Sequence, residues 1–123
     1  MMSRDEIAAE LIAGCHEGRT RENIDRLYAT DAVSVEAMDM GQGRETRGRD
    51  AIKGKHDWWD GAMETLSQRI DGPYPHGPDR FALVFHVEAR NKSGGDVIRS
   101  EEVAVYHLAD GAIVREEFFY RPD

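Results

Sequence analysis

Four side chains have the types needed to move a proton or to stabilise the charge it leaves: Glu36, His86, Glu101 and Tyr120. A histidine titrates near neutral pH, and a carboxylate opposite it can hold the ring in one tautomer. A carboxylate in an apolar pocket gains a raised pKa that suits a proton shuttle, and a tyrosine hydroxyl can donate to an oxyanion. We take these four as candidate catalytic residues. Structural alternatives stay open for each: a wall histidine, exposed carboxylates and a core tyrosine.

A hairpin loop of four residues, 92–95, would place His86 opposite Glu101 in neighbouring antiparallel strands. The same register sets Glu88 opposite Arg99, and opposite charges across a ladder favour the pairing. A loop one residue longer would pair His86 with the residue after Glu101. Glu101 would then lie on the other face, because side chains alternate along a strand.

Asp110 and Gly111 are typical of a two-residue hairpin turn, which extends the row to the last strand. With that turn Glu101 faces Tyr120, so that His86, Glu101 and Tyr120 form one cross-strand row. We expect this row to point into a pocket, with His86 as the residue that matters most for chemistry or binding. Apolar side chains on the same face would contact the ligand: Val84, Val103 and Phe118.

The elements that must position these residues follow an α+β order, with helices first and an antiparallel meander last. A capping-box pair, Ser3 and Glu6, starts the first helix. The third expected helix carries a stripe at helical spacing that includes His56 and Trp59. The proline-rich residues 73–78 are expected to turn the chain. The expected helices are 3–18, 20–29 and 48–63, the expected loop is 38–47, and the expected strands are 32–37, 65–74, 80–90, 97–108 and 112–120.

The chain has 123 residues and a formal net charge of −8 without a basic cluster, so it lacks the positive face that nucleic-acid phosphates require. No apolar run approaches the ~18 residues of a membrane span, and the N-terminus lacks the apolar stretch of a signal peptide. The single cysteine, Cys15, cannot form an internal disulfide, so we expect a cytoplasmic protein with one domain, residues 1–123. No close-spaced ligand motif or nucleotide-binding loop is present, and we expect neither a metal nor a cofactor.

Five segments carry a family resemblance over nearly the whole chain: YATDA (28–32) before a strand, GRDAI (48–52) at a helix start, GPYPHG (72–77), EEVAVY (101–106) and IVREEFFY (113–120). In this order they resemble the SnoaL-like branch of the nuclear-transport-factor-2-like superfamily. The resemblance implies a cone, in which a strongly curved, mainly antiparallel sheet wraps around three helices and admits a small apolar molecule at its mouth. Known members of this fold include ketosteroid isomerase, scytalone dehydratase and polyketide cyclases, alongside non-catalytic domains.

Alignment on the first of these segments puts Glu36 where isomerase-like members keep their proton-shuttling carboxylate. The two oxyanion-hole positions of those members fall near Ile12 and Val103, which cannot donate a hydrogen bond. Steroid-type isomerisation by that mechanism is therefore disfavoured. The resemblance also implies that His56 and Glu116 point toward the pocket. Trp59, which shares the helix stripe with His56, completes the expected ligand contacts.

We expect a small-molecule pocket protein that carries out cofactor-free acid–base chemistry on a small apolar carbonyl compound, as isomerase, dehydratase or cyclase. Two alternatives remain, a non-catalytic binding domain and a dimeric interaction module with a vestigial pocket, because one fold can host unrelated functions. Members of the family are commonly homodimers, and the second face of the expected sheet is also apolar. We expect a second copy to cover that outer face, which would carry Phe85, Tyr106 and Phe119.

Overall fold

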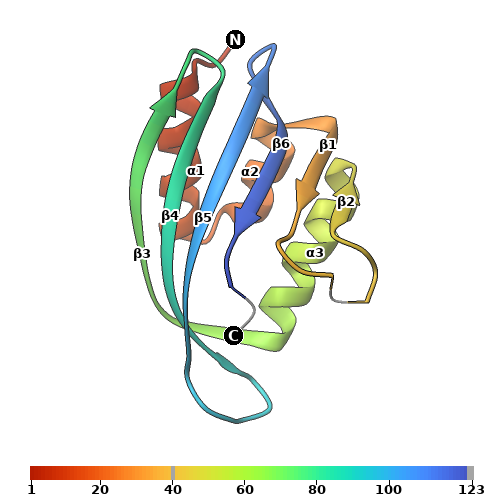
Figure 1. Ribbon diagram of the computed structural model, residues 1–123, viewed down its shortest axis with the longest axis vertical. Helices are drawn as coiled ribbons and strands as arrows, with labels where there is room; N and C mark the ends of the chain where they lie inside the picture. Colours follow the sequence, from red (N-terminus) through yellow and green to blue (C-terminus); the bar gives the residue numbers. More distant parts are fainter. Residues whose placement is uncertain (40, 122–123) are drawn as a thin grey trace.

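Three helices and six strands make up the part of the chain that the structure describes, residues 1–39 and 41–121 of a computed structural model (Figure 1). The helices are α1 (Arg4–Glu17), α2 (Thr20–Leu27) and α3 (Arg49–Ala62). The strands are β1 (Tyr28–Val35), β2 (Glu45–Arg47), β3 (Met63–His76), β4 (Arg80–Asn91), β5 (Ile98–Ala109) and β6 (Ala112–Phe119). The expected α+β class with three helices is confirmed.

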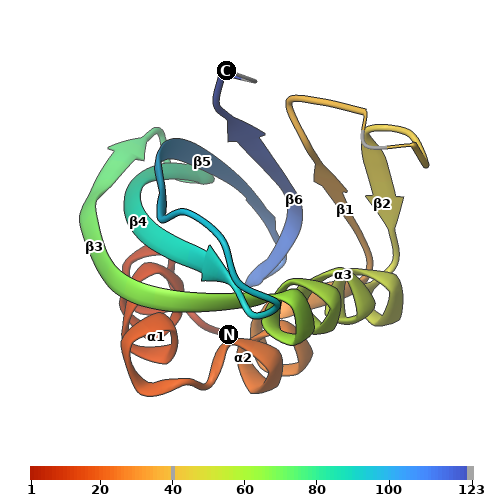
Figure 2. The same ribbon diagram turned by 90° about the horizontal axis from the view of Figure 1, so that it is seen from below.

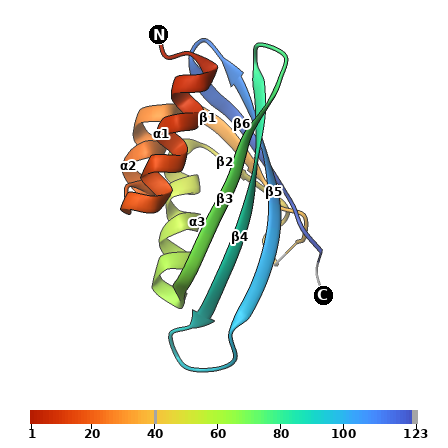
Figure 3. The same cartoon turned by 90° about the vertical axis from the view of Figure 1, so that its left-hand side faces the viewer.

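All six strands belong to one sheet with the order β2-β1-β6-β5-β4-β3. β1 and β6 run parallel, and every other neighbouring pair is antiparallel. The sheet curls strongly but does not close, and the helices lie along its concave side (Figures 2 and 3). We call the side that meets the helices the inner face and the opposite side the outer face.

The hydrophobic core lies between the helices and the inner face. The first helix begins as expected, because the Ser3 side chain accepts from the Glu6 amide and the Glu6 carboxylate accepts from the Ser3 amide. Apolar side chains of all three helices then pack against the sheet. The largest contributors from helices and strands are Ile7, Leu11, Ile24, Leu27, Ile52, Phe81, Leu83, Tyr106 and Ile113.

The inner face of β4 and β5 carries the side chains that the sequence suggested for the outer face. Phe81 and Leu83 are buried in the core, and Phe85 packs against it. Tyr106, expected on the dimer face, is only 3% exposed and stacks on Phe81 with ring centroids 5.1 Å apart. The expected outer set is therefore wrong for Phe85 and Tyr106, whereas Phe119 is 52% exposed. The bulkier rings fill the concave side, and the smaller valines remain outside.

One of the two predicted hairpin registers is confirmed. Glu88 pairs with Arg99 and His86 with Glu101, as expected. In the next hairpin the turn is also correct, but a bulge between the pairs of His107 and Leu108 shifts every later pair by one residue. Since neighbouring residues point to opposite faces, this shift turns the β6 side chains over relative to β5.

The proline-rich segment is strand rather than turn. β3 runs through Pro73 and Pro75 to His76, with an irregular register between Asp71 and Tyr74. β3 is an edge strand, where a proline without an amide hydrogen is tolerated. Residues 38–47, expected as a loop, contain the short strand β2; Met40 in this segment lies outside the described residues.

Candidate functional site

A buried carboxylate on β6 accepts hydrogen bonds from two hydroxyl groups at the inner face. Glu116 is 4% exposed. The Tyr28 hydroxyl donates to its Oε1, and the Ser34 hydroxyl donates to its Oε2 at 2.7 Å. Burial raises the pKa of Glu116, and the two hydroxyl hydrogen bonds act in the opposite direction. A buried carboxylate with both oxygens paired is a fixed polar centre inside a mostly apolar core.

The ammonium group of Lys55, on α3, links this centre to a second carboxylate. Its Nζ donates to Ser34 Oγ at 2.6 Å and to Glu36 Oε1 at 2.8 Å. The hydroxyl of Tyr120 donates to the other oxygen of Glu36 at 3.0 Å. Nζ also lies 5.2 Å from the centroid of the Phe118 ring, within the range of a cation–π contact. The inner polar chain, as we call it, runs in this order: Tyr28, Glu116, Ser34, Lys55, Glu36 and Tyr120.

Strand alternation and helix spacing explain why these side chains meet. Ser34 and Glu36 are two residues apart and therefore point to the same side of the chain at the end of β1. The parallel pairing of β1 with β6 sets Ser34 beside Glu116. On α3, Lys55 follows the buried Ile52 by three residues, so both face the sheet.

Glu102 adds a third inner carboxylate without joining the chain. It lies on β5 opposite Phe85 and two residues before the buried Ala104, which places it on the inner face. No hydrogen bond or ion pair connects it to another described residue. Burial, and then the nearby charge of Glu36, raise its pKa to about 7.

The site combines these polar groups with aromatic walls. The rings of Tyr28 and Tyr106 are buried, and burial is the main cause that raises the pKa of each hydroxyl. Burial and the charge of Glu36 raise the pKa of Tyr120 to about 12, so it remains a hydrogen-bond donor at neutral pH. The arrangement therefore sets hydrogen-bond donors and carboxyl groups among aromatic rings at the inner face.

Four of the residues predicted from the sequence come together here: Glu36, Tyr120, Glu116 and Phe118. Sequence reasoning missed the groups that connect them, because each looks ordinary in isolation. A lysine on a helix and a serine in a strand are usually exposed, and only the tertiary contacts reveal their roles. The missed residues are Tyr28, Ser34, Lys55 and Glu102.

The expected row of His86 and Glu101 lies on the outer face, away from this site. His86 Nε2 is 2.9 Å from Asp71 Oδ2, and its Nδ1 is 3.4 Å from Glu101 Oε2. The hydrogen bond from His86 is the main cause that lowers the pKa of Asp71. The prediction that His86 and Glu101 share a cavity with Glu36 and Tyr120 is therefore wrong, because Leu83 and Phe85 face the core and alternation along β4 turns His86 to the other side.

Val84 and Val103 pair with each other on this same outer side, so they do not line the inner site either. His86 and Glu101 instead line an open hollow of ≈ 440 Å³ across β3, β4 and β5. Its other lining side chains include Arg69, which forms an exposed pair with Asp71. The mixed charges of this hollow are already paired with one another.

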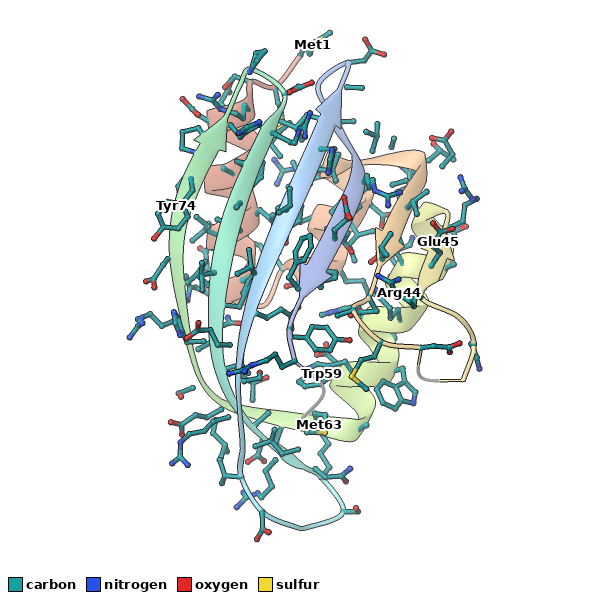
Figure 4. All side chains as sticks on the ribbon, viewed as in Figure 1. Met1, Arg44, Glu45, Trp59, Met63 and Tyr74 are labelled. Carbon is teal, nitrogen blue, oxygen red and sulfur yellow. The ribbon has the colours of Figure 1, made fainter. Side chains whose placement is uncertain are left out.

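His56 and Trp59 on α3 do not join the inner polar chain. His56 Nε2 is 3.1 Å from Asp60 Oδ2 of the following turn. Trp59 is 39% exposed, and Figure 4 shows it with Met63 near the end of α3 that leads into β3. The side of α3 that faces the inner polar chain carries Lys55 instead. Contacts of His56 and Trp59 with a ligand therefore stay predictions.

Two further properties bear on the class of site. Among residues 1–39 and 41–121, no group of three or more histidine, cysteine, aspartate or glutamate side chains is arranged to hold a metal ion. No helix in the described part of the chain has both the length and the apolar character needed to cross a membrane.

Comparison with known proteins identifies the family. The SnoaL-like domain matches residues 2–120. The chain belongs to the SnoaL-like family. A comparison with curated proteins finds no match. The resemblance seen in the five sequence segments is thus confirmed.

Solved structures of SnoaL-like and related proteins share this fold. A Mesorhizobium loti protein, provisionally described as a SnoaL-like polyketide cyclase, has 30% identity and a TM-score of 0.88, covering 97% of this chain and 100% of its own. A Bacillus subtilis protein, provisionally described as an isomerase, has 20% identity and a TM-score of 0.81, with coverages of 98% and 91%. A Catenulispora acidiphila protein with a ketosteroid isomerase-like fold, in complex with trimethylamine, has 19% identity and a TM-score of 0.75, with coverages of 95% and 86%.

Proposed function

We propose that this SnoaL-like protein binds a small, mostly apolar carbonyl compound at the inner site and carries out cofactor-free acid–base chemistry on it. The observation that carries the proposal is the inner polar chain from Tyr28 to Tyr120, which sets donors and carboxylates among aromatic rings. Such groups act more strongly on a ligand when water is excluded. Isomerisation, dehydration and cyclisation all need only proton transfers and a stabilised oxyanion.

The names of similar proteins support this reaction class. The Mesorhizobium loti protein is described in terms of a polyketide cyclase and the Bacillus subtilis protein in terms of an isomerase. Both reactions begin when a proton leaves a carbon next to a carbonyl group. The site of this chain has the matching parts, since Lys55 can donate to an oxygen and Glu102 can titrate near neutral pH.

The experiment uses 2-tetralone, a small apolar ketone with exchangeable hydrogens next to its carbonyl. We expect the protein in heavy water at pH 7 to accelerate hydrogen–deuterium exchange at that carbon by about 10²-fold or more over buffer, measured by proton NMR. Binding without faster exchange would favour a non-catalytic binding domain. Neither binding nor exchange would favour an interaction module and contradict the proposal.

We also propose that two copies associate through the outer face. Apolar side chains at its centre include Phe119, Val103 and Val84, which form one cross-strand row. Around them lie charges of both signs, which a second copy of the same face can complement after a two-fold rotation. Exposed apolar area bordered by polar residues is typical of an interaction surface.

Replacing Phe119 by glutamate is expected to convert this dimer into a monomer, because two like charges would be buried at its centre. Light scattering at micromolar concentration measures the change in mass. Leu66→Glu, at another exposed apolar position on β3, is the matched control and should leave the dimer intact. A wild-type monomer, or a Phe119→Glu dimer, would show that the outer face is not the interface.

A further inference from the structure

We propose that Glu102 is the side chain of this site that exchanges a proton with the bound ligand, an inference that rests on the function proposed above. The sequence pointed instead to Glu36 and His86. His86 lies on the outer face, so the choice falls among the three inner carboxylates, Glu36, Glu102 and Glu116.

Two of these carboxylates are already occupied by partners. Glu116 accepts from Tyr28 and Ser34 through its two oxygens. Glu36 accepts from Lys55 through one oxygen and from Tyr120 through the other. Charge-assisted or hydroxyl donors at both oxygens stabilise the charged form of a carboxylate and hold the group in one orientation. These two carboxylates are better suited to positioning than to proton transfer.

Glu102 has the opposite environment. It is half-buried on the same inner face, and no described side chain donates to it. Burial is the main cause that disfavours its ionised form, and the charges of Glu36 and Glu116 add to this effect, whereas the positive charge of Lys55 opposes it. The pKa of about 7 that results leaves both the acid and the carboxylate populated at neutral pH. A group with both forms available can take up a proton and return it.

The donors needed for the charged intermediate are also present. The Lys55 ammonium has three hydrogens, and its two hydrogen bonds go to Ser34 and Glu36, which leaves one hydrogen for a ligand oxygen. The Tyr120 hydroxyl has a single hydrogen, which goes to the far oxygen of Glu36 and helps to hold that carboxylate beside Lys55. These groups position and stabilise, whereas Glu102 touches the hydrogen that moves.

The proposed step is balanced without any co-reactant. The Glu102 carboxylate takes a proton from the carbon next to the ligand carbonyl, so that the C–H bond breaks and an O–H bond forms on Glu102. The electron pair of the broken bond moves into the ligand and places negative charge on the carbonyl oxygen, opposite the Lys55 ammonium. Glu102 then returns a proton to the same carbon or to a conjugated one, and in heavy water its carboxyl exchanges the proton for a deuteron with solvent before the return. The second outcome is an isomerisation.

The test compares 2-tetralone exchange by the wild type and by Glu102→Gln, which keeps the shape of the side chain but cannot take a proton. We expect the variant to lose about 10²-fold or more of the exchange rate at pH 7. The wild-type rate should also rise with pH through an inflection near 7 that the variant lacks. Glu88→Gln, on the outer face in an exposed pair with Arg99, is the matched control and should behave as the wild type.

The possible failures can be told apart. Exchange that persists in folded Glu102→Gln but disappears in folded Glu36→Gln would overturn the role of Glu102 and leave the proposed function intact. A wild type that does not accelerate exchange would overturn both. Circular dichroism of each variant establishes that it is folded before the rates are compared.

Discussion

Replacing Glu116 by alanine is expected to lower the free energy of unfolding by about 3–5 kcal/mol. The change leaves the buried hydroxyls of Tyr28 and Ser34 without their acceptor, and each such group costs about 1–3 kcal/mol when it stays unpaired. It also removes side-chain volume from a site that is only 4% exposed. Urea denaturation monitored by tryptophan fluorescence measures the difference.

The neighbouring residue provides the matched control. Glu117 lies on the other face of β6, where it pairs with Arg115 and His107 near the surface. Glu117→Ala is expected to cost no more than about 1 kcal/mol, as is usual for a partly exposed ion pair. Equal losses for Glu116→Ala and Glu117→Ala would contradict the assignment of Glu116 as the buried centre of the inner polar chain.

Glu102→Gln is expected to stabilise the protein at alkaline pH and to have little effect in acid. The pKa of Glu102 rises from its ordinary 4.5 to about 7 on folding. Below 4.5 the carboxyl is protonated in both states and costs nothing. As the pH rises through this window the unfolded chain releases its proton first, so the wild type loses stability. The variant has no such group and should gain about 3 kcal/mol at pH 8 but only about 1 kcal/mol at pH 5.

Denaturation curves of both proteins at these two pH values measure the gain. A constant difference between wild type and variant across the range would mean that the carboxyl does not titrate abnormally. A carboxylate that costs stability at neutral pH is typical of a functional position rather than of a structural one.

The sequence predicted the strand order of the last two hairpins better than it predicted which face points inward. The cross-strand charge pair of Glu88 and Arg99 favoured the register of β4 and β5 that the structure has. It could not decide the inner face, because valines line one side of this hairpin and aromatic residues line the other. The side that carries Phe81 and Tyr106 faces inward because these large rings fill the concave core. This packing depends on the tertiary structure and not on the local sequence.

The bulge in β6 had a second consequence. A regular hairpin would have kept Glu116, Phe118 and Tyr120 on the side of His86. The one-residue shift turned them to the opposite side, which is the inner face. The expectation that these three point inward is therefore met, although the reasoning that led to it placed His86 with them. No turn signal in the sequence indicates a bulge of this kind.

The helix α3 shows the same limit for the site. Its stripe of Ile52, His56 and Trp59 is correctly spaced for a helix, but only Ile52 is buried. Lys55, which directly precedes His56, lies on the side of the helix that meets β1. Spacing alone would have allowed the pair of Ile52 and Lys55, three residues apart, to be considered. Spacing could not show that the Ser34 hydroxyl and the Glu36 carboxylate lie opposite this position and accept hydrogen bonds from the lysine.

The measurement that tests the inner site most directly is the set of intermolecular NOEs between 2-tetralone and side chains of the wild-type protein. The site described above predicts contacts from the ligand to the ring of Phe118 and to the methylene hydrogens of Lys55 and Glu102. Contacts confined to the methyl groups of Val84 and Val103 would place the ligand on the outer face and contradict it.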